Sequence, residues 1–178
     1  MTRIWRRRPR GSGIILVEFV YRDGVLQGAG LRLRAVCGRG GVSGEKREGD
    51  GATPLGRMEL VRVLYRADRV KPPVCPVPVE PIGKFDGWCD DVGDAAYNRP
   101  VALPYGASHE ALWRADGVYD VIGVLGWNLS PVVPGRGSAI FLHVATPDFA
   151  PTAGCVALAL PDVLAALAAG MTSILALG

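Results

Sequence analysis

The sequence predicts a mainly β, single-domain fold, a twisted β-sandwich or partly closed barrel with two short helices. Three observations support this prediction. A chain of 178 residues suffices for one hydrophobic core without help from disulfides or metal. Its 24 glycines and 14 prolines are spread along the chain, as in folds whose short strands are joined by tight turns. Several apolar segments have the length of single strands, and no internal repeat or linker separates them.

Seven segments have the apolar pattern of strands, and the second of them alternates Leu with Arg. They are residues 14–22, 31–36, 57–65, 118–125, 138–145, 155–159 and 172–177. The Gly-rich, charged segment 38–52 predicts a long exposed loop. The five prolines of 70–81 exclude a helix or an interior strand, and 84–100 lacks periodicity and predicts an irregular segment.

Two helices are predicted. Ser108 is a suitable N-cap for a helix over 108–115, with Glu110 favourable in its first turn. The second helix starts with Pro161 at its first position and Asp162 beside it, and continues to Gly170.

The first twelve residues hold five arginines and predict a basic flexible tail (1–12) before a domain at 13–178. Nucleic-acid binding is not expected, because the rest of the chain offers no basic face with aromatic platforms. The apolar stretch behind the arginines is interrupted by Glu18, so it reads as a strand and not as a signal peptide. No segment has the length of a transmembrane helix.

The four cysteines, at 37, 75, 89 and 155, show no spacing typical of zinc ligands, so no metal site is predicted. A bridge between Cys75 and Cys89 is compatible with an oxidising compartment, and free thiols are the alternative.

Cys155 and His143 are the candidate catalytic residues. His143 lies near the end of one predicted strand and Cys155 opens the next, so antiparallel pairing would bring them within reach of each other. An imidazole can then take the thiol proton and leave a thiolate nucleophile. Gly154 permits a positive φ, so the amides of Gly154 and Cys155 can point at an oxyanion. The alternative is two ordinary core residues, since free cysteines and strand histidines are often buried.

The run from His143 to Cys155, with Thr152-Ala-Gly154-Cys155 at its end, resembles the signature of L,D-transpeptidase (YkuD-type) catalytic domains. The segment from Lys46 to Gly56 (KREGDGATPLG) resembles the family's K-x-E-G-D-x-x-T-P-x-G stretch. The segments GWCDD at 87–91, YN at 97–98 and GSAIFLH at 137–143 fit one branch of the family, in the right order.

The resemblance implies a bacterial cell-wall enzyme of the periplasm or cell envelope, although the sequence shows no recognisable signal peptide. Cys155 would attack a carbonyl of a peptidoglycan stem, typically beside meso-diaminopimelate. The thioester would pass to an acceptor amine, giving a three-to-three or one-to-three cross-link. His143 would be the base, and no cofactor is implied. The family is often acylated by carbapenems, so such an adduct is expected.

Substrate-binding residues are expected among the motif residues, namely Thr152, Trp88, Asp90, Asp91, Tyr97, Asn98 and Arg136. Acidic side chains suit the amine of diaminopimelate, and loop packing is the alternative role for residues 88–98. Arg136 and Asn128 either contact a carboxylate or shape a turn. His109 is either a surface residue or a substrate contact. The charged residues of 46–50 either form a solvated run or, by the resemblance, a structural loop near the site.

Two departures from the family pattern affect acceptor choice. Ala153 stands where many members have histidine, and Ala157 where they have arginine. The segment between His143 and Cys155 is also shorter than in many members. The alternatives to a transpeptidase are an L,D-carboxypeptidase or amidase acting on stems, and a non-catalytic peptidoglycan-binding module.

Overall fold

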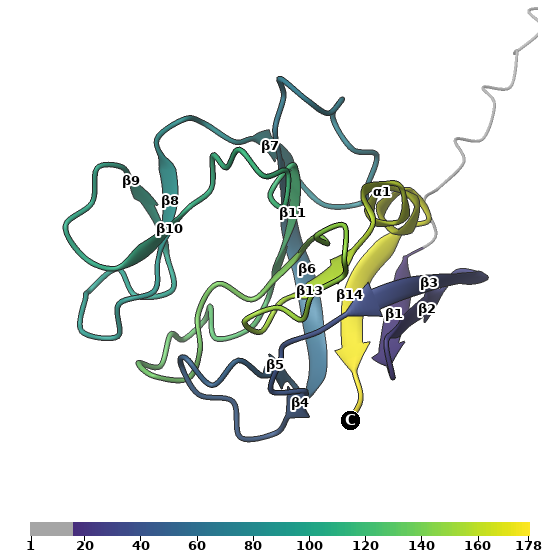
Figure 1. The fold of residues 1–178 in the computed structure, drawn as a ribbon, viewed down its shortest axis with the longest axis horizontal. Coiled ribbons are helices and arrows are strands. Elements are labelled where there is room, and N and C mark those ends of the chain that lie inside the picture. The colour runs from purple at the N-terminus through teal and green to yellow at the C-terminus, as the bar shows by residue number, and fades with distance from the viewer. Residues whose placement is uncertain (1–15) are drawn as a thin grey trace, which may run out of the picture.

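The computed structural model describes residues 16–178, which form a barrel of β-strands with an α-helix packed against it (Figure 1). Eight strands of this described part hydrogen-bond in a closed ring, because β11 pairs with β12 on one side and with β6 on the other. In order around the ring they are β11 (Val121–Leu125), β12 (Phe141–Val144), β13 (Val156–Leu158), β3 (Leu31–Val36), β2 (Val25–Gly28), β1 (Val17–Arg22), β14 (Met171–Ala176) and β6 (Gly56–Tyr65). A further strand, β7 (Val79–Pro81), adds to β6. The predicted tail 1–12 lies outside the described residues.

Two small sheets lie beside the ring. One has three strands in the order β10 (His109–Ala111), β8 (Asp86–Cys89) and β9 (Pro100–Ala102), and the other pairs β4 (Val42–Ser43) with β5 (Thr53–Pro54). Figure 1 shows the three-stranded sheet on the opposite side of β6 and β11 from β1, β2 and β3. The segment 84–100, expected to be irregular, therefore supplies a strand to a separate layer.

The barrel interior and the face beneath this layer are both apolar. The interior is filled by side chains such as Phe19, Leu142 and Ile174. A second cluster joins Trp88 of β8 to Phe141 of β12, whose rings meet edge to face at 5.2 Å. All five residues of β11 are buried because one of its faces meets the interior and the other meets this second cluster. The β8–β10 layer thus covers one outer face of the barrel.

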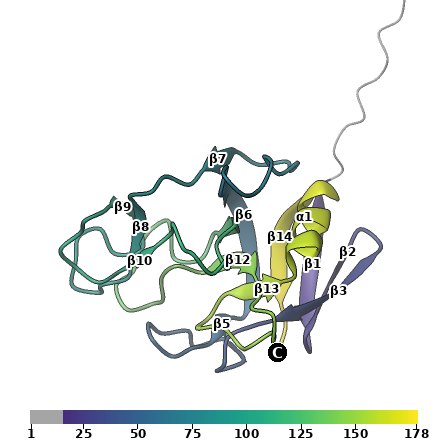
Figure 2. The ribbon, with the colours of Figure 1, turned by 45° about the horizontal axis from the view of Figure 1, so that its top comes forward.

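The helix α1 (Leu160–Ala168) joins β13 to β14 and packs against β12 and β14 (Figures 1 and 2). Its buried residues Val163, Ala166 and Leu167 have the three- and four-residue spacing of one helix face. Pro161 and Asp162 occupy its first turn, as predicted, and the chain leaves the helix through Gly170 at φ +91°.

The prediction of a mainly β, barrel-like fold is confirmed, and the ring closes completely. The prediction of a second helix over 108–115 is wrong. Residues His109–Ala111 form β10 instead, with Glu110 opposite Trp88 of β8. Helix propensity is a weak preference that sheet pairing overrides here. No helix within 16–178 combines the length and apolarity that a membrane span requires.

Candidate active site

Cys155 and His143 project from the same outer face of the barrel. The strands β12 and β13 pair in parallel, with His143 opposite Ala157 and Leu142 opposite Val156. Cys155 directly precedes β13, two residues before Ala157, so it lies diagonally across from His143 on the same face. The predicted antiparallel pairing is wrong. Residues 145–155 are long enough to cross back to the start of β13, which a parallel pair requires.

The Cys155 thiol is held by the backbone of the chain that leads into β12. Its Sγ donates to the Ala139 carbonyl at 3.2 Å and accepts from the Phe141 amide at 3.3 Å. Burial raises the pKa of Cys155 to about 12, and the Glu110 carboxylate adds to the rise. The Phe141 amide and Lys46 act in the opposite direction. The resting nucleophile is therefore a neutral thiol at neutral pH.

The imidazole of His143 is fixed by the backbone and by an aromatic ring. Nδ1 lies 2.9 Å from the Val144 carbonyl, and because a carbonyl only accepts, Nδ1 carries the proton and Nε2 is a free base. The Tyr119 ring meets the imidazole edge to face at 5.5 Å. Burial lowers the pKa of His143, although the Val144 hydrogen bond opposes this shift. The ring is therefore neutral and able to accept a proton at neutral pH.

The turn before the nucleophile depends on Gly154. Its φ is +147°, and a Cβ at this position would lie 2.9 Å from the Ala52 carbonyl oxygen. The Gly154 amide donates to Thr152 Oγ1 at 3.1 Å, and Thr152 Oγ1 donates to the Cys155 carbonyl at 2.7 Å. The amide of Gly154 is thus engaged within the turn. Of the two amides expected to face an oxyanion, that of Cys155 remains the candidate.

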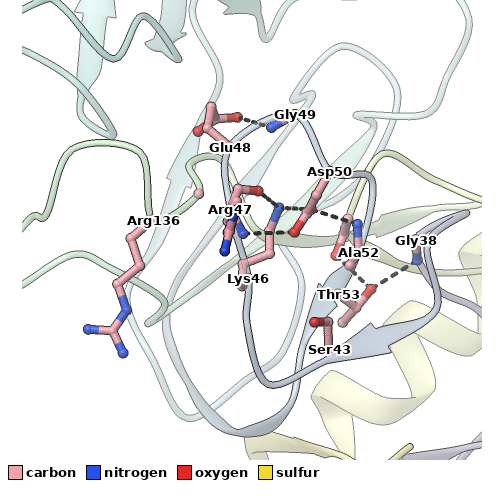
Figure 3. Close-up of polar contacts among 12 residues, drawn as sticks. Gly38, Ser43, Lys46, Arg47, Glu48, Gly49, Asp50, Ala52, Thr53 and Arg136 are labelled. Atoms are coloured by element: carbon pink, nitrogen blue, oxygen red, sulfur yellow. Dashed lines mark hydrogen bonds and ion pairs between the residues drawn. The ribbon is translucent and has the colours of Figure 1, made fainter.

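The loop over 38–52 supports this turn. Its residues 44, 45, 47, 49 and 50 are exposed, as predicted, but Lys46 is not. Lys46 is buried, and its Nζ donates to Asp50 Oδ1 at 2.5 Å and to the Arg47 carbonyl at 2.6 Å (Figure 3). Thr53, fully buried, donates through Oγ1 to the Gly154 carbonyl at 2.7 Å. The charged run is therefore a structural loop beside the nucleophile.

Two neighbouring cavities flank the pair. The histidine cavity, of about 420 Å³, has among its lining residues Glu110, Arg114, Tyr119, His143, Ala153 and Ala157. The cysteine cavity, of about 150 Å³, has among its lining residues Lys46, Glu48, Asp90, Glu110, Ala153 and Cys155.

Glu110 and Ala153 line both cavities and so mark their junction. Tyr119 Oη donates a hydrogen bond to Glu110 Oε2. Burial raises the pKa of Glu110, and the nearby carboxylates Asp90 and Glu48 act in the same direction. A carboxylate with an elevated pKa therefore lies at the junction beside the thiol.

The residues of 88–98 that are expected to bind substrate do not all lie at the active site. Trp88 and Asn98 are buried, and the Trp88 indole donates to Asn98 Oδ1 at 3.0 Å. Tyr97 is buried and donates to Glu48 Oε2. Asp91 accepts from the Gly93 amide in a surface turn. Of this group only Asp90 lines a cavity that contains the nucleophile, and burial of Trp88 and Asn98 does not fit direct contact with a substrate.

The other candidates have local contacts. Arg136 is exposed, stacks on Trp127 at 5.2 Å, and points away from the Lys46–Asp50 pair (Figure 3). Asn128 bonds the Val133 backbone and the Gly137 carbonyl, as a turn residue does. His109 is partly buried, with Nδ1 2.7 Å from the Ala107 carbonyl. Both cysteines of the considered bridge are free thiols, as are Cys37 and Cys155.

Sequence reasoning missed Glu110 and Tyr119 as site residues. Glu110 was assigned to the first turn of a helix that does not form, and Tyr119 to the apolar pattern of a strand. No local pattern marks either of them. Only the pairing of β10 with β8 carries Glu110 to the face that holds Cys155.

Across residues 16–178, no cluster of three or more His, Cys, Asp or Glu side chains could hold a metal ion. A buried thiol, a neutral imidazole and a cavity at each suit nucleophilic acyl transfer.

A family model described as the L,D-transpeptidase catalytic domain matches residues 16–172. The match covers most of the chain and confirms the resemblance inferred from the motifs. Comparisons with curated proteins and with solved structures found no match.

Proposed function

Because the chain belongs to the L,D-transpeptidase catalytic domain family, we propose that it transfers acyl groups between peptidoglycan stem peptides through a thioester on Cys155. The observation that carries the proposal is the placement of Cys155 and His143 on one face of adjacent strands, with a cavity at each. A neutral thiol beside a neutral imidazole is the starting state that general-base activation requires.

The first half-reaction acylates the thiol. The thiol leaves the Ala139 carbonyl and gives its proton to Nε2 of His143 as sulfur attacks the carbonyl carbon of a donor stem. The Cys155 amide stabilises the oxyanion. The carbon–nitrogen bond then breaks, and Nε2 returns the proton to the leaving amine. The products are a thioester and the released residue.

The second half-reaction transfers the acyl group to an amine. The acceptor nitrogen attacks the thioester carbon, the carbon–sulfur bond breaks, and a proton passes through His143 to the departing thiolate. A donor carbonyl on meso-diaminopimelate, the third stem residue, gives a three-to-three linkage, and a donor carbonyl on the first stem residue gives a one-to-three linkage. Its substrate places this reaction in the cell envelope.

Product analysis tests the proposal. The purified chain is incubated with disaccharide stem peptides, and the products are separated and weighed by mass spectrometry. Dimers are expected with the wild type and not with Cys155→Ala. Trimmed monomers without dimers, even at excess acceptor, would identify a hydrolase instead.

A second measurement separates an enzyme from a binding module. The intact mass after exposure to a carbapenem is expected to show one adduct, absent in Cys155→Ala. Binding to peptidoglycan without adduct or turnover would contradict the proposal.

A further inference from the structure

Glu110 occupies a place that the acyl transfer described above does not use. It lies in β10, opposite Trp88 of β8, and its side chain lines both the histidine cavity and the cysteine cavity. Any group that reaches the Cys155 sulfur while also meeting His143 must therefore pass close to this carboxylate.

The carboxylate of Glu110 is held by one oxygen and open at the other. Tyr119 Oη donates to Oε2, and the Tyr119 ring packs edge to face on both His143 and Phe141. Among the described residues no donor meets Oε1, yet this oxygen is not one of the atoms buried without a partner. Oε1 therefore opens into the cavities, fixed in place and able to accept a hydrogen bond.

A second carboxylate beside it has an unused buried oxygen. Asp90 lines the cysteine cavity, and its Oδ1 is buried without a hydrogen-bond donor among residues 16–178. An acceptor left in this condition costs free energy unless a donor arrives. A ligand with N–H groups would supply that donor.

Two of the three cations that line the cavities, Lys46 and Arg114, are already paired within the protein, and the third, Arg39, lines the cysteine cavity with no ion pair to a described residue. Lys46 donates to Asp50, and Arg114 forms an ion pair with Asp116. Glu48, the third carboxylate of the cysteine cavity, accepts from Tyr97 and Ser138. Glu110 and Asp90 thus remain the acceptors available to a ligand, and the chemistry that satisfies both is a primary ammonium group with three donors.

We propose that Glu110, with Asp90, binds the ammonium group of the amino-acid acceptor beside the Cys155 thioester. This inference rests on the proposed transferase function and names the group that selects an amine over water.

An ammonium nitrogen loses two protons when it becomes an amide nitrogen. One passes to the carboxylate of Glu110 and on to solvent, and the other passes through His143 to the departing thiolate. An elevated pKa at Glu110 suits it to accept that first proton.

The test compares acceptors that differ in charge. The acyl-enzyme is formed with a donor stem at pH 7. Three acceptors then compete for its acyl group: a cationic stem amine, neutral hydroxylamine and water. For Glu110→Gln, transfer to the stem amine is expected to fall roughly tenfold to a hundredfold, the size of a lost charge-assisted hydrogen bond, with a higher acceptor KM. Transfer to hydroxylamine and to water should change by less than about twofold.

Two further variants keep the result interpretable. Asp90→Asn should raise the acceptor KM in the same direction, and Glu80→Gln, an exposed carboxamide swap on β7, should change nothing. Thermal melting of each variant checks that the fold is retained.

The outcomes are distinct. If the wild type makes dimers, then equal losses toward the stem amine and hydroxylamine in Glu110→Gln, or an acceptor KM that is unchanged in this variant, would overturn the role of Glu110 and leave the transferase standing. A wild type that forms no acyl-enzyme would overturn the transferase itself.

Discussion

Cys155 and His143 lie diagonally across two parallel strands, yet no hydrogen bond joins these two described residues. The thiol is bonded to the backbone at Ala139 and Phe141, and the imidazole to the carbonyl of Val144. The two reactive groups are thus positioned independently by main-chain atoms.

Replacing His143 should remove the base without removing the nucleophile. In His143→Gln, acylation by a donor stem is expected to fall by about 10²–10⁴, the usual contribution of a general base. Stopped-flow or timed mass measurements of the acyl-enzyme check this. A variant that is acylated at the wild-type rate would contradict the assignment.

The pH dependence of acylation should follow from the depressed pKa of His143. Because burial disfavours the imidazolium, the base stays unprotonated below the ordinary histidine pKa of about 6.5. The acylation rate is expected to hold as the pH falls to that value and to decline only below it. A decline in the acylation rate that is centred above pH 6.5 would mean that the protein stabilises the imidazolium, which would contradict this prediction.

The Cys155 thiol should titrate late, and Glu110 should be one reason. Burial raises the pKa to about 12, with the Glu110 charge as the next cause. Removing that charge in Glu110→Gln is expected to lower the pH at which alkylation of Cys155 is half-maximal, because the thiolate then has no negative charge at position 110 beside it. Iodoacetamide labelling of Cys155 against pH, read by peptide mass mapping, measures the shift. Glu80→Gln is the matched control, and a midpoint that stays or rises in Glu110→Gln would refute this cause.

Gly154 should not tolerate a side chain. Gly154→Ala combines a φ of +147° with a Cβ 2.9 Å from the Ala52 carbonyl, so a loss of about 1–3 kcal/mol in the free energy of unfolding is expected. Gly106→Ala, whose Cβ would meet nothing within 4 Å, should be near neutral. Urea titrations of both variants measure the difference. Equal stabilities would show that the turn relaxes around the added methyl group.

The Lys46–Asp50 pair should make stability depend on acid. Burial alone would raise the pKa of Asp50, but hydrogen bonds from Lys46 and from the Arg47 and Ala52 amides bring it below its ordinary value. Its contribution is therefore present above the unfolded pKa of about 3.9 and is lost as the pH falls through the lower folded pKa.

At neutral pH, Asp50→Asn leaves the buried Lys46 ammonium without its charged partner and should cost about 1–3 kcal/mol. The deficit should shrink toward pH 3, whereas the exposed Asp23→Asn should show none. Denaturant titrations at both pH values measure it, and a deficit independent of pH would contradict the role of the pair.

The sequence predicted local elements well because their signals are local. The Leu–Arg alternation of 31–36 became β3, with Leu33 and Ala35 buried, and Pro161 marked the start of α1. The site motifs also single out Cys155, His143 and Gly154, and Gly154 has the positive φ that its position predicts.

The errors came from contacts between distant segments. Residues 108–115 have helical propensity, but pairing with β8 makes His109–Ala111 a strand. The direction of β13 depends on the path of 145–155, which no local pattern fixes. Lys46 looked solvated because its partner Asp50 and the loop that buries it are visible only in the fold. Glu110 entered the site for the same reason.

The most direct test of the central claim is the mass of the chain during turnover with a tetrapeptide donor stem. Rapid acid quenching followed by peptide mapping should find the donor acyl group on Cys155, and it should disappear when an acceptor amine is added as dimers form. Cys155→Ala should show neither adduct nor dimer. Dimers made by Cys155→Ala, or an acyl group mapped to Cys37, Cys75 or Cys89, would contradict the account.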